Sequence, residues 1–444
     1  MNKVTKTIFL LGTVVALVGC SSNSDSDAVR KVVSYPGIKQ LRAADEPSDG
    51  RYENFSEHVD FLKQMDKFSS KASDKIIWEN YVEGKNFAMS PYSLELCLGL
   101  AARCANGKTR QEIMDAMGMD YDMLKDNYPY FFRAGSFTEK TNTGDVSSIS
   151  LPNNSIWLNK GIKFKEDCLD DLKSSFYCDS FSADFANKNK EANKAIKEYI
   201  SQKTKGLIAP DLDLSPVTLF VLMNTIYIKD VWNDSGSDLT YADESYKFKN
   251  YNGEYSSKRL LSGYSFSGRA YSGEDYSSFF TRTNNSFTIT FIKPNEGKTL
   301  REVFNEKTIN ETRERVYQTK DEEKMERYYT QCIFPEYEAE ADIDLVETFI
   351  NDFNVKSLFS SACDFSNITD NEAYCEDFKQ IAKLKVKKNG VEGAAVTYMA
   401  VCGATAPDNR WTDVYEKFVL DKEFGFILSG SQGVVFSGVV TNID

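Results

Sequence analysis

The chain contains a single histidine, His58, which limits the hydrolytic chemistry that its side chains can perform. A Ser/His/Asp or Cys/His catalytic group would have to use this residue, and so would any metal site that includes histidine. His58 lies in a stretch that matches no motif (FSEHV), and an exposed helix histidine is the simpler interpretation. The 66 acidic residues leave carboxylate-pair chemistry open, but no short motif selects a pair. We therefore expect no enzymatic activity, no metal and no cofactor.

The cysteines indicate export rather than catalysis. Lys3 and Lys6 precede an apolar run over residues 8–18, and the sequence then reads Leu-Val-Gly-Cys up to Cys20. This arrangement resembles a bacterial lipobox, which predicts a signal peptide over residues 1–19 and a lipid on Cys20. The alternative is an ordinary signal peptide followed by a chance cysteine. The other eight cysteines include no CxxC pair, so we expect scattered buried thiols rather than a zinc site, in a compartment that permits disulfides.

The predicted location is the bacterial cell envelope, with Cys20 anchored in the outer membrane. The polar, acidic stretch after Cys20 (SSNSDSD) is similar to signals that send lipoproteins to the extracellular face. Residues 20–48 then read as a flexible tether, and residues 49–444 as a single domain, expected to be monomeric. The net charge of −13 repels phosphate backbones, so nucleic acid is not an expected partner.

Hydrophobic periodicity predicts an α+β protein. Apolar spacing favours helices over residues 55–68, 91–105 and 191–204. The second of these begins with Ser90-Pro91, a capping residue followed by proline at the first helical position. The apolar run 217–228 (VTLFVLMNTIYI) predicts a strand buried on both faces. Further strands are expected over residues 287–292, 424–428 and 434–440. Helices dominate the first half and strands the second, which favours α+β over a doubly wound sheet.

Several segments, in order and with family spacing, resemble the serpin family from about residue 50 to the end. The segments are residues 86–94 (NFAMSPYSL), 107–113 (GKTRQEI), 222–229 (LMNTIYIK), 291–294 (FIKP), 364–368 (DFSNI) and 433–442 (GVVFSGVVTN). The resemblance implies a serpin fold with three β-sheets, about nine helices and an exposed C-terminal reactive loop over about residues 390–412. It also implies a hydrogen-bonded switch cluster under the central sheet. The members of that cluster would be Ser90, Ser93, Asn224 and Gln380, with glutamine where the family has histidine.

In serpins the reactive loop is cleaved and then inserts into the central sheet as a new strand, and this chain's loop has the pattern that insertion requires. Alternate residues of a strand point to opposite faces. One face of the hinge carries small or apolar residues without charge, so it can enter an interior. The hinge residues are Gly390, Val391, Glu392, Gly393, Ala394, Ala395, Val396 and Thr397.

The family's spacing places the bait bond between Ala404 and Thr405. Alanine there suits serine proteases that prefer small residues, such as elastase-like or subtilisin-like enzymes. Arg410-Trp411 is a second candidate, for trypsin-like enzymes. The resemblance implies a suicide-substrate inhibitor that holds its target protease as a covalent acyl-enzyme complex. The alternative is a non-inhibitory serpin-fold binding or substrate module. It remains open because Lys387 and Lys388 replace the family's acidic residues and Val391 its usual Thr or Ser.

Overall fold

The computed structural model describes residues 35, 37–140, 146–232, 239–265, 270–284, 287–315, 320–321, 324, 326–392 and 412–444. The expected signal peptide, Cys20, the hinge positions after Glu392 and both candidate bait bonds lie outside these residues. None of the described helices combines the length and apolar character needed to cross a lipid bilayer.

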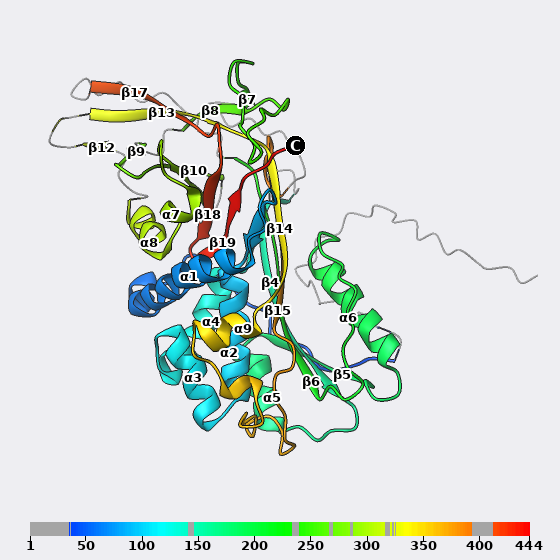
Figure 1. Cartoon of the computed structure of the whole chain (residues 1–444). Coiled ribbons are helices and arrows are strands. Elements are labelled where there is room, and N and C mark those ends of the chain that lie inside the picture. The colour runs from blue at the N-terminus through cyan, green and yellow to red at the C-terminus, as the bar shows by residue number, and fades with distance from the viewer. Residues whose placement is uncertain are drawn as a thin grey trace, which may run out of the picture. The chain divides into compact units, whose positions relative to one another are not determined.

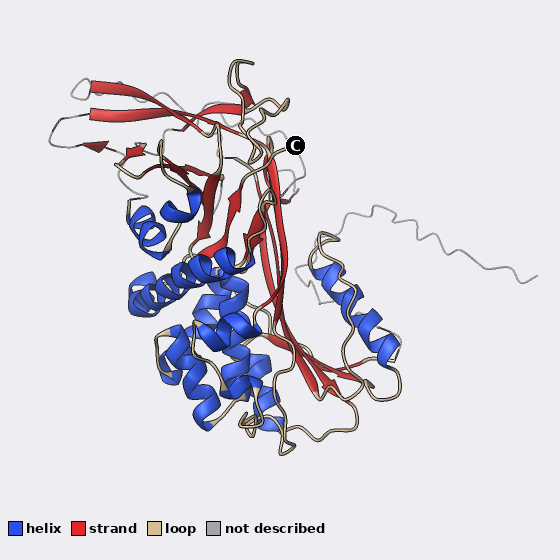
Figure 2. Cartoon of the chain, in the orientation of Figure 1, coloured by secondary structure: helices blue, strands red, loops and turns tan. Residues whose placement is uncertain are grey.

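The strands form three sheets, drawn in red in Figure 2. The large sheet has the order β1 (Lys39–Arg42), β5 (Cys178–Ala183), β4 (Val146–Asn159), β6 (Phe220–Asp230), β16 (Gly390–Val391), β15 (Lys379–Lys387) and β14 (Tyr337–Asp344), with β3 (Phe137–Lys140) paired to β4. The second sheet is β2 (Phe87–Met89), β19 (Gly433–Val440), β18 (Phe424–Gly430), β11 (Thr288–Pro294), β10 (Tyr276–Arg282) and β9 (Tyr271–Ser272). The third is β12 (Lys320–Asp321), β13 (Glu326–Phe334), β8 (Leu261–Ser265) and β7 (Thr240–Tyr241), with β17 (Thr412–Val419) paired to β13.

The described residues also form nine α-helices, and most of them cover one face of the large sheet. They are α1 (Val59–Asn80), α2 (Pro91–Cys104), α3 (Gly107–Met117), α4 (Tyr121–Ala134), α5 (Glu166–Ser174), α6 (Asn189–Lys203), α7 (Leu300–Val303), α8 (Glu306–Glu314) and α9 (Val346–Asn351). Helices α1 to α5 and α9 gather on one side of the sheet, whereas α6 lies on the other (Figure 1). The predicted α+β class, the three sheets and the number of helices are confirmed.

The sequence signals at Ser90 and Pro91 correctly predicted the start of α2. Ser90 accepts a hydrogen bond from the backbone nitrogen of Ser93 at 3.2 Å, and Pro91 is the first residue of α2. Both follow from the rules for a helix N-terminus. The first helix differs from its expected form, because residues 55–58 form a 3-10 turn and α1 then continues to Asn80. His58 is accordingly half-buried at the junction, stacked on Tyr130 at 3.8 Å between ring centroids.

The expectation of a loose tether over residues 20–48 is wrong for its last part. Strand β1 pairs antiparallel with β5 and adds an edge to the large sheet. Tyr35 is 4% exposed and packs against Trp157 and Tyr199, with ring centroids 6.2 and 6.4 Å away. The compact unit therefore begins at Tyr35, well before the predicted boundary at residue 49. Polar composition alone did not reveal the edge strand, because its partner lies far along the chain.

Tyr35 is expected to hold this N-terminal segment in place. Its hydroxyl donates to Gln202 Oε1 at 3.1 Å, and burial is the main cause that raises the pKa of Tyr35 to about 12. We expect Tyr35→Ala to destabilise the fold by about 3 kcal/mol, because it empties a buried aromatic site. Thermal unfolding measures this, with Leu41→Ala as a control on the same segment, at a side chain that is 39% exposed. If both variants melt like the wild type, the segment is not docked in solution.

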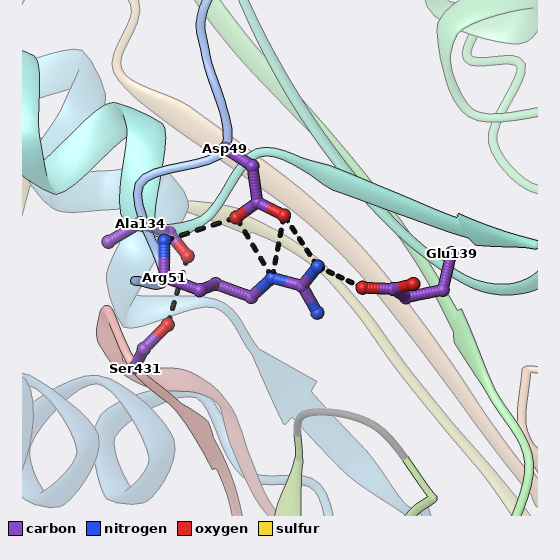
Figure 3. Close-up of polar contacts among 5 residues, drawn as sticks. All are labelled: Asp49, Arg51, Ala134, Glu139 and Ser431. Carbon is purple, nitrogen blue, oxygen red and sulfur yellow. Dashed lines mark hydrogen bonds and ion pairs between the residues drawn. The ribbon is translucent and has the colours of Figure 1, made fainter. Parts of the chain in front are cut away.

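Arg51 connects the segment that follows β1 to strand β3 (Figure 3). Its guanidinium lies between Asp49, at 2.6 Å, and Glu139 of β3, and stacks 3.9 Å above the ring of Phe137. The preceding residue must be glycine, since a Cβ on Gly50 would meet Cβ of Arg133 at 2.7 Å. The carbonyl of Ala134 in turn accepts a hydrogen bond from Ser431 Oγ at 3.0 Å. These contacts join the N-terminal segment, α4 and the β18–β19 turn.

Candidate functional site

The centre of the large sheet has a gap one strand wide. Strand β6 pairs with β4 along one edge, but on its other edge only Asp230 has a described partner, Val391 of β16. Strand β15 likewise pairs with β14 along its full length and with β16 only at its last residues. No hydrogen-bond ladder joins β6 to β15 in the part of the chain that the structure describes. We call the space between β6 and β15 the slot.

A cavity of about 380 Å³ occupies the slot and is partly open to solvent. Residues at the start of α2 line it on one face of the sheet, and residues of α6 and of the segment that follows it line it on the other. Glu392 lies at the end where β16 enters. The two strands that border the cavity contribute Ile226 and Ile228 from β6, and Ile381, Ala382 and Leu384 from β15. The slot therefore offers an extended chain two strand edges and a largely apolar surface.

The slot also corrects one expectation from the sequence. The run 217–228 was expected to be a strand buried on both faces, yet residues 220–224 of β6 are only half-buried. The physical reason is that one neighbouring strand is missing along this stretch. Periodicity describes what a strand contains and carries no information about whether both of its edges are filled.

The structure brings the four expected members of the switch cluster to the floor of the slot. Gln380 of β15 accepts from the backbone nitrogen of Ser90 and donates to its carbonyl, both at 2.9 Å. Ser90 Oγ donates to the carbonyl of Val435 at 2.7 Å. On the opposite edge, Ser93 Oγ donates to Asn224 Oδ1 of β6 at 2.6 Å. The cluster thus ties the N-terminus of α2 to both strands that border the slot.

A further member was missed by sequence reasoning. Asn154 of β4 accepts from Asn224 Nδ2 at 2.9 Å and donates to Tyr128 Oη at 2.9 Å and to the carbonyl of Phe176 at 2.7 Å. It is 1% exposed, so its amide is held by these three bonds. No local pattern around Asn154 distinguishes it from other asparagines, because its partners come from three other elements.

Gln380 is expected to matter for stability. It is 9% exposed and satisfies both backbone groups of Ser90, which is itself 2% exposed. We expect Gln380→Ala to cost about 2 kcal/mol, because the variant leaves the buried backbone N–H of Ser90 without its partner, whereas the Ser90 carbonyl keeps the N–H of Leu94. The measurement is thermal unfolding, with the neighbouring exposed Lys379→Ala as the matched control. Equal melting temperatures for the two variants would show that the cluster does not hold the fold.

Two of the hinge residues already belong to the large sheet. Gly390 has φ +139°, and a Cβ there would meet the carbonyl oxygen of Asp230 at 2.1 Å, so only glycine fits. Val391 pairs with both Val386 and Asp230 and is 0% exposed. Glu392 follows with a φ of +58°, a left-handed backbone conformation that residues other than glycine rarely adopt. The strand therefore stops at Glu392, at the mouth of the slot.

The single histidine has a local structural role. His58 Nδ1 lies 2.7 Å from Asn127 Oδ1, and no serine, cysteine or acidic side chain is bonded to it among the described contacts. Within the same residues, no group of three or more His, Cys, Asp or Glu side chains has a geometry that could hold a metal ion.

Comparison with known proteins agrees with this architecture. The family model described as Serpin (serine protease inhibitor) matches residues 63–443. Serpin I2 of Homo sapiens is 24% identical over 381 residues, which cover 81% of this chain and 86% of that protein. Iripin-1 of Ixodes ricinus is 25% identical over 378 residues, which cover 81% of this chain and 89% of that protein.

Solved structures share the fold. The native state of the thermophilic serpin tengpin superposes with a TM-score of 0.69 at 18% identity, covering 91% of this chain and 100% of that chain. Cleaved Serpin 42Da superposes with a TM-score of 0.68 at 18% identity, covering 87% of this chain and 99% of that chain. Since the family model spans most of the chain and the three-sheet architecture is shared, this protein belongs to the serpin family.

Proposed function

We propose that this serpin inhibits serine proteases by loop cleavage followed by insertion of the hinge into the slot. Serpins are typically protease inhibitors without catalytic activity, although some members do not inhibit. The observation that carries the proposal is the slot itself, a vacant strand position at whose entrance Val391 is already paired with both β15 and β6, and Gly390 with β15.

The existing pairs define the register that the inserted strand would take. Val391 lies opposite Val386 of β15 and Asp230 of β6. Continuing both antiparallel ladders sets Gly393 between Leu384 and Ile228, and Ala395 between Ala382 and Ile226. These partners point into the interior, so the small hinge residues would meet the apolar floor of the slot. Thr397 would then come between Gln380 and Asn224, where its hydroxyl can join the switch cluster.

The backbone of Glu392 supplies a local reason for the transition. A non-glycine residue in the left-handed region costs roughly 1 kcal/mol or more relative to an extended conformation. Continuing the strand requires Glu392 to become extended, which removes this strain. Its backbone nitrogen already donates to the carbonyl of Lys385 at 2.7 Å, as the continuing ladder with β15 requires. Insertion would thus begin from a paired and strained end.

We propose Ala404–Thr405 as the bait bond, with Arg410–Trp411 as the second candidate, and a protease that prefers small residues as the target. The nucleophile of the protease would remain esterified to Ala404 while the hinge enters the slot. We also propose that the protein acts as a monomer, anchored through lipidated Cys20 in the outer membrane of a bacterial envelope. This would place the bait loop where proteases outside the cytoplasm can reach it.

The test is to incubate the full chain with elastase, subtilisin and trypsin and to separate the products in SDS. Inhibition predicts a complex that survives boiling in SDS, together with an N-terminal sequence of the released fragment that begins at Thr405. Variant Ala404→Arg should shift the preference towards trypsin. Cleavage with complete release of active protease by all three enzymes would contradict inhibition and support the substrate or binding module.

A further inference from the structure

A second cavity, of about 330 Å³, lies at the end of the slot opposite Glu392. It shares Cys97 of α2, Leu222 of β6 and Phe378 with the cavity of the slot. We call this second cavity the lower cavity. Sites for small molecules usually measure about 300–1,000 Å³, so the lower cavity has the size of a small ligand site.

Most of the side chains that line the lower cavity are apolar. Helix α2 contributes Leu98 and Ala101, and the start of β6 contributes Phe220. The ring of Phe220 meets that of Phe365 edge to face, with centroids 5.1 Å apart and an interplanar angle of 83°, and both rings line the cavity. An aromatic ligand can extend this pair, because such ring contacts contribute free energy beyond the area that they bury. The wall therefore favours an apolar, aromatic body.

The charged side chains of the lower cavity are all acidic. Among the residues that the structure describes, Glu372, Glu376 and Asp377 line it, and no lysine, arginine or histidine does. The carboxylate of Asp377 is paired with Lys379 at 3.4 Å. Those of Glu372 and Glu376 form no ion pair with any described side chain. The cavity thus offers two unpaired negative charges to a ligand.

The segment that carries these two glutamates holds them at the mouth of the lower cavity. Exposure alternates along it, since Glu372, Tyr374 and Glu376 are exposed whereas Ala373 and Cys375 are partly buried. Tyr374 is 58% exposed and stands between the two glutamates in the sequence. An ammonium group is attracted both to carboxylates and to the face of a tyrosine ring. The mouth therefore favours a positive charge.

We propose that the lower cavity binds a small amine with an apolar, aromatic body, and that the bound amine blocks full insertion of the hinge. The second part rests on the inhibitory function proposed above, whereas the first part does not. Continuing the ladder with β6 sets Met399 opposite Leu222, on the face of the inserted strand that points towards α2. The Met399 side chain and a ligand in the lower cavity would then compete for the same space.

Isothermal titration calorimetry on the full chain at neutral pH tests the site with three probes that share one body. The probes are phenylbutylamine, phenylbutanol and phenylbutyrate, which are positive, neutral and negative at this pH. We expect the amine to bind about tenfold more tightly than the alcohol, a difference of about 1.4 kcal/mol, and the carboxylate to bind most weakly. Equal affinities for the three probes, or no measurable binding of the amine, would overturn the proposal.

Variants of the lining residues locate the bound amine. The double variant Glu372→Gln, Glu376→Gln keeps the shape of the mouth and removes its charge, so the amine should lose its advantage while the alcohol binds as before. Ala101→Leu narrows the cavity and should weaken both probes. Glu314→Gln, at an exposed position on α8, is the matched control and should change neither affinity. An advantage of the amine that survives in the double variant places the cation elsewhere and overturns the assignment.

The effect on insertion is measured separately. The full chain is mixed with elastase or subtilisin, with and without saturating phenylbutylamine, and the SDS-stable complex and the cleaved chain are quantified. We expect the amine to cause loss of the complex and gain of cleaved chain in the wild type but not in the double variant. An unchanged fraction of complex with the amine bound overturns the blocking of insertion. Absence of any complex without the amine contradicts inhibition instead, and calorimetry still decides whether the site exists.

Discussion

Replacing Ala395 by glutamate is expected to abolish the proposed inhibition and to leave a protein that proteases cleave as a substrate. The register of the hinge places residue 395 between Ala382, which is 3% exposed, and Ile226 on the floor of the slot. Insertion of Ala395→Glu would bury a carboxylate in an apolar site, which costs several kcal/mol. The cleaved loop would then stay outside the sheet, and the protease would complete hydrolysis.

The measurement is the fraction of protease that stays in an SDS-stable complex at equal concentrations of the two proteins. We expect at least a tenfold loss for Ala395→Glu, because a rate difference of this size needs only about 1.4 kcal/mol on the insertion step. Cleaved wild-type protein should also melt far above the uncleaved protein, and this gain should disappear in the variant.

Ala394→Glu is the matched control. The same register turns residue 394 to the face that carries α6, opposite Tyr227 and Lys383, where a carboxylate can reach the ammonium of Lys383, whose side chain is 27% exposed. This variant should keep its complex formation. Loss of inhibition in both variants, or in neither, would contradict the alternation on which the insertion proposal depends.

Glu95→Gln is expected to stabilise the protein above mildly acidic pH. Glu95 lies on α2, is 1% exposed and accepts a hydrogen bond from Ser69 Oγ at 2.6 Å. Its second carboxylate oxygen has no hydrogen-bond partner among the described residues. Burial raises the pKa of Glu95 well above its ordinary value, with a further rise from Asp66 of α1 and an opposing effect from Arg313 of α8.

The raised pKa sets the direction of the pH dependence. In the folded state the protonated carboxyl is favoured, so its stabilising contribution is complete below the unfolded-state value of 4.5. This contribution is lost as the pH rises through the higher folded-state pKa. Glutamine has the same shape as the protonated acid and does not ionise. The variant should match the wild type near pH 4 and exceed it at pH 8 by about 2 kcal/mol or more.

Urea unfolding at a series of pH values measures this difference. Glu314→Gln, at an exposed position on α8, serves as the control and should leave the pH profile unchanged. A constant difference between Glu95→Gln and wild type from pH 4 to pH 8 would show that Glu95 does not change its protonation on unfolding.

The features that follow from neighbouring residues were predictable. Ser90-Pro91 marks the start of α2 because capping and the fixed φ of proline act within one turn. The alternation of small and larger residues in the hinge is likewise a property of the segment itself. Family motifs then placed Ser90, Ser93, Asn224 and Gln380 in one cluster, and the structure has them tied to α2 from both edges of the slot.

Other features depended on contacts between segments that lie far apart in the chain. The slot exists because β6 has no neighbouring strand along most of one edge. The sequence of a strand does not determine which strand pairs with each of its edges. Strand β1 forms only because it pairs with β5, which lies more than a hundred residues away in the sequence. Asn154 and Glu95 are ordinary residues in their local context and become distinctive only once buried.

The amino-acid sequence by itself determined the family, the positions of the main helices and strands, and the alternating pattern of the hinge, since each arises from local periodicity, capping and motif spacing. The tertiary structure alone decided where a strand is missing and which polar groups are buried. The physical reason is that edge pairing and burial are properties of packing, and packing joins residues whose separation along the chain carries no signal.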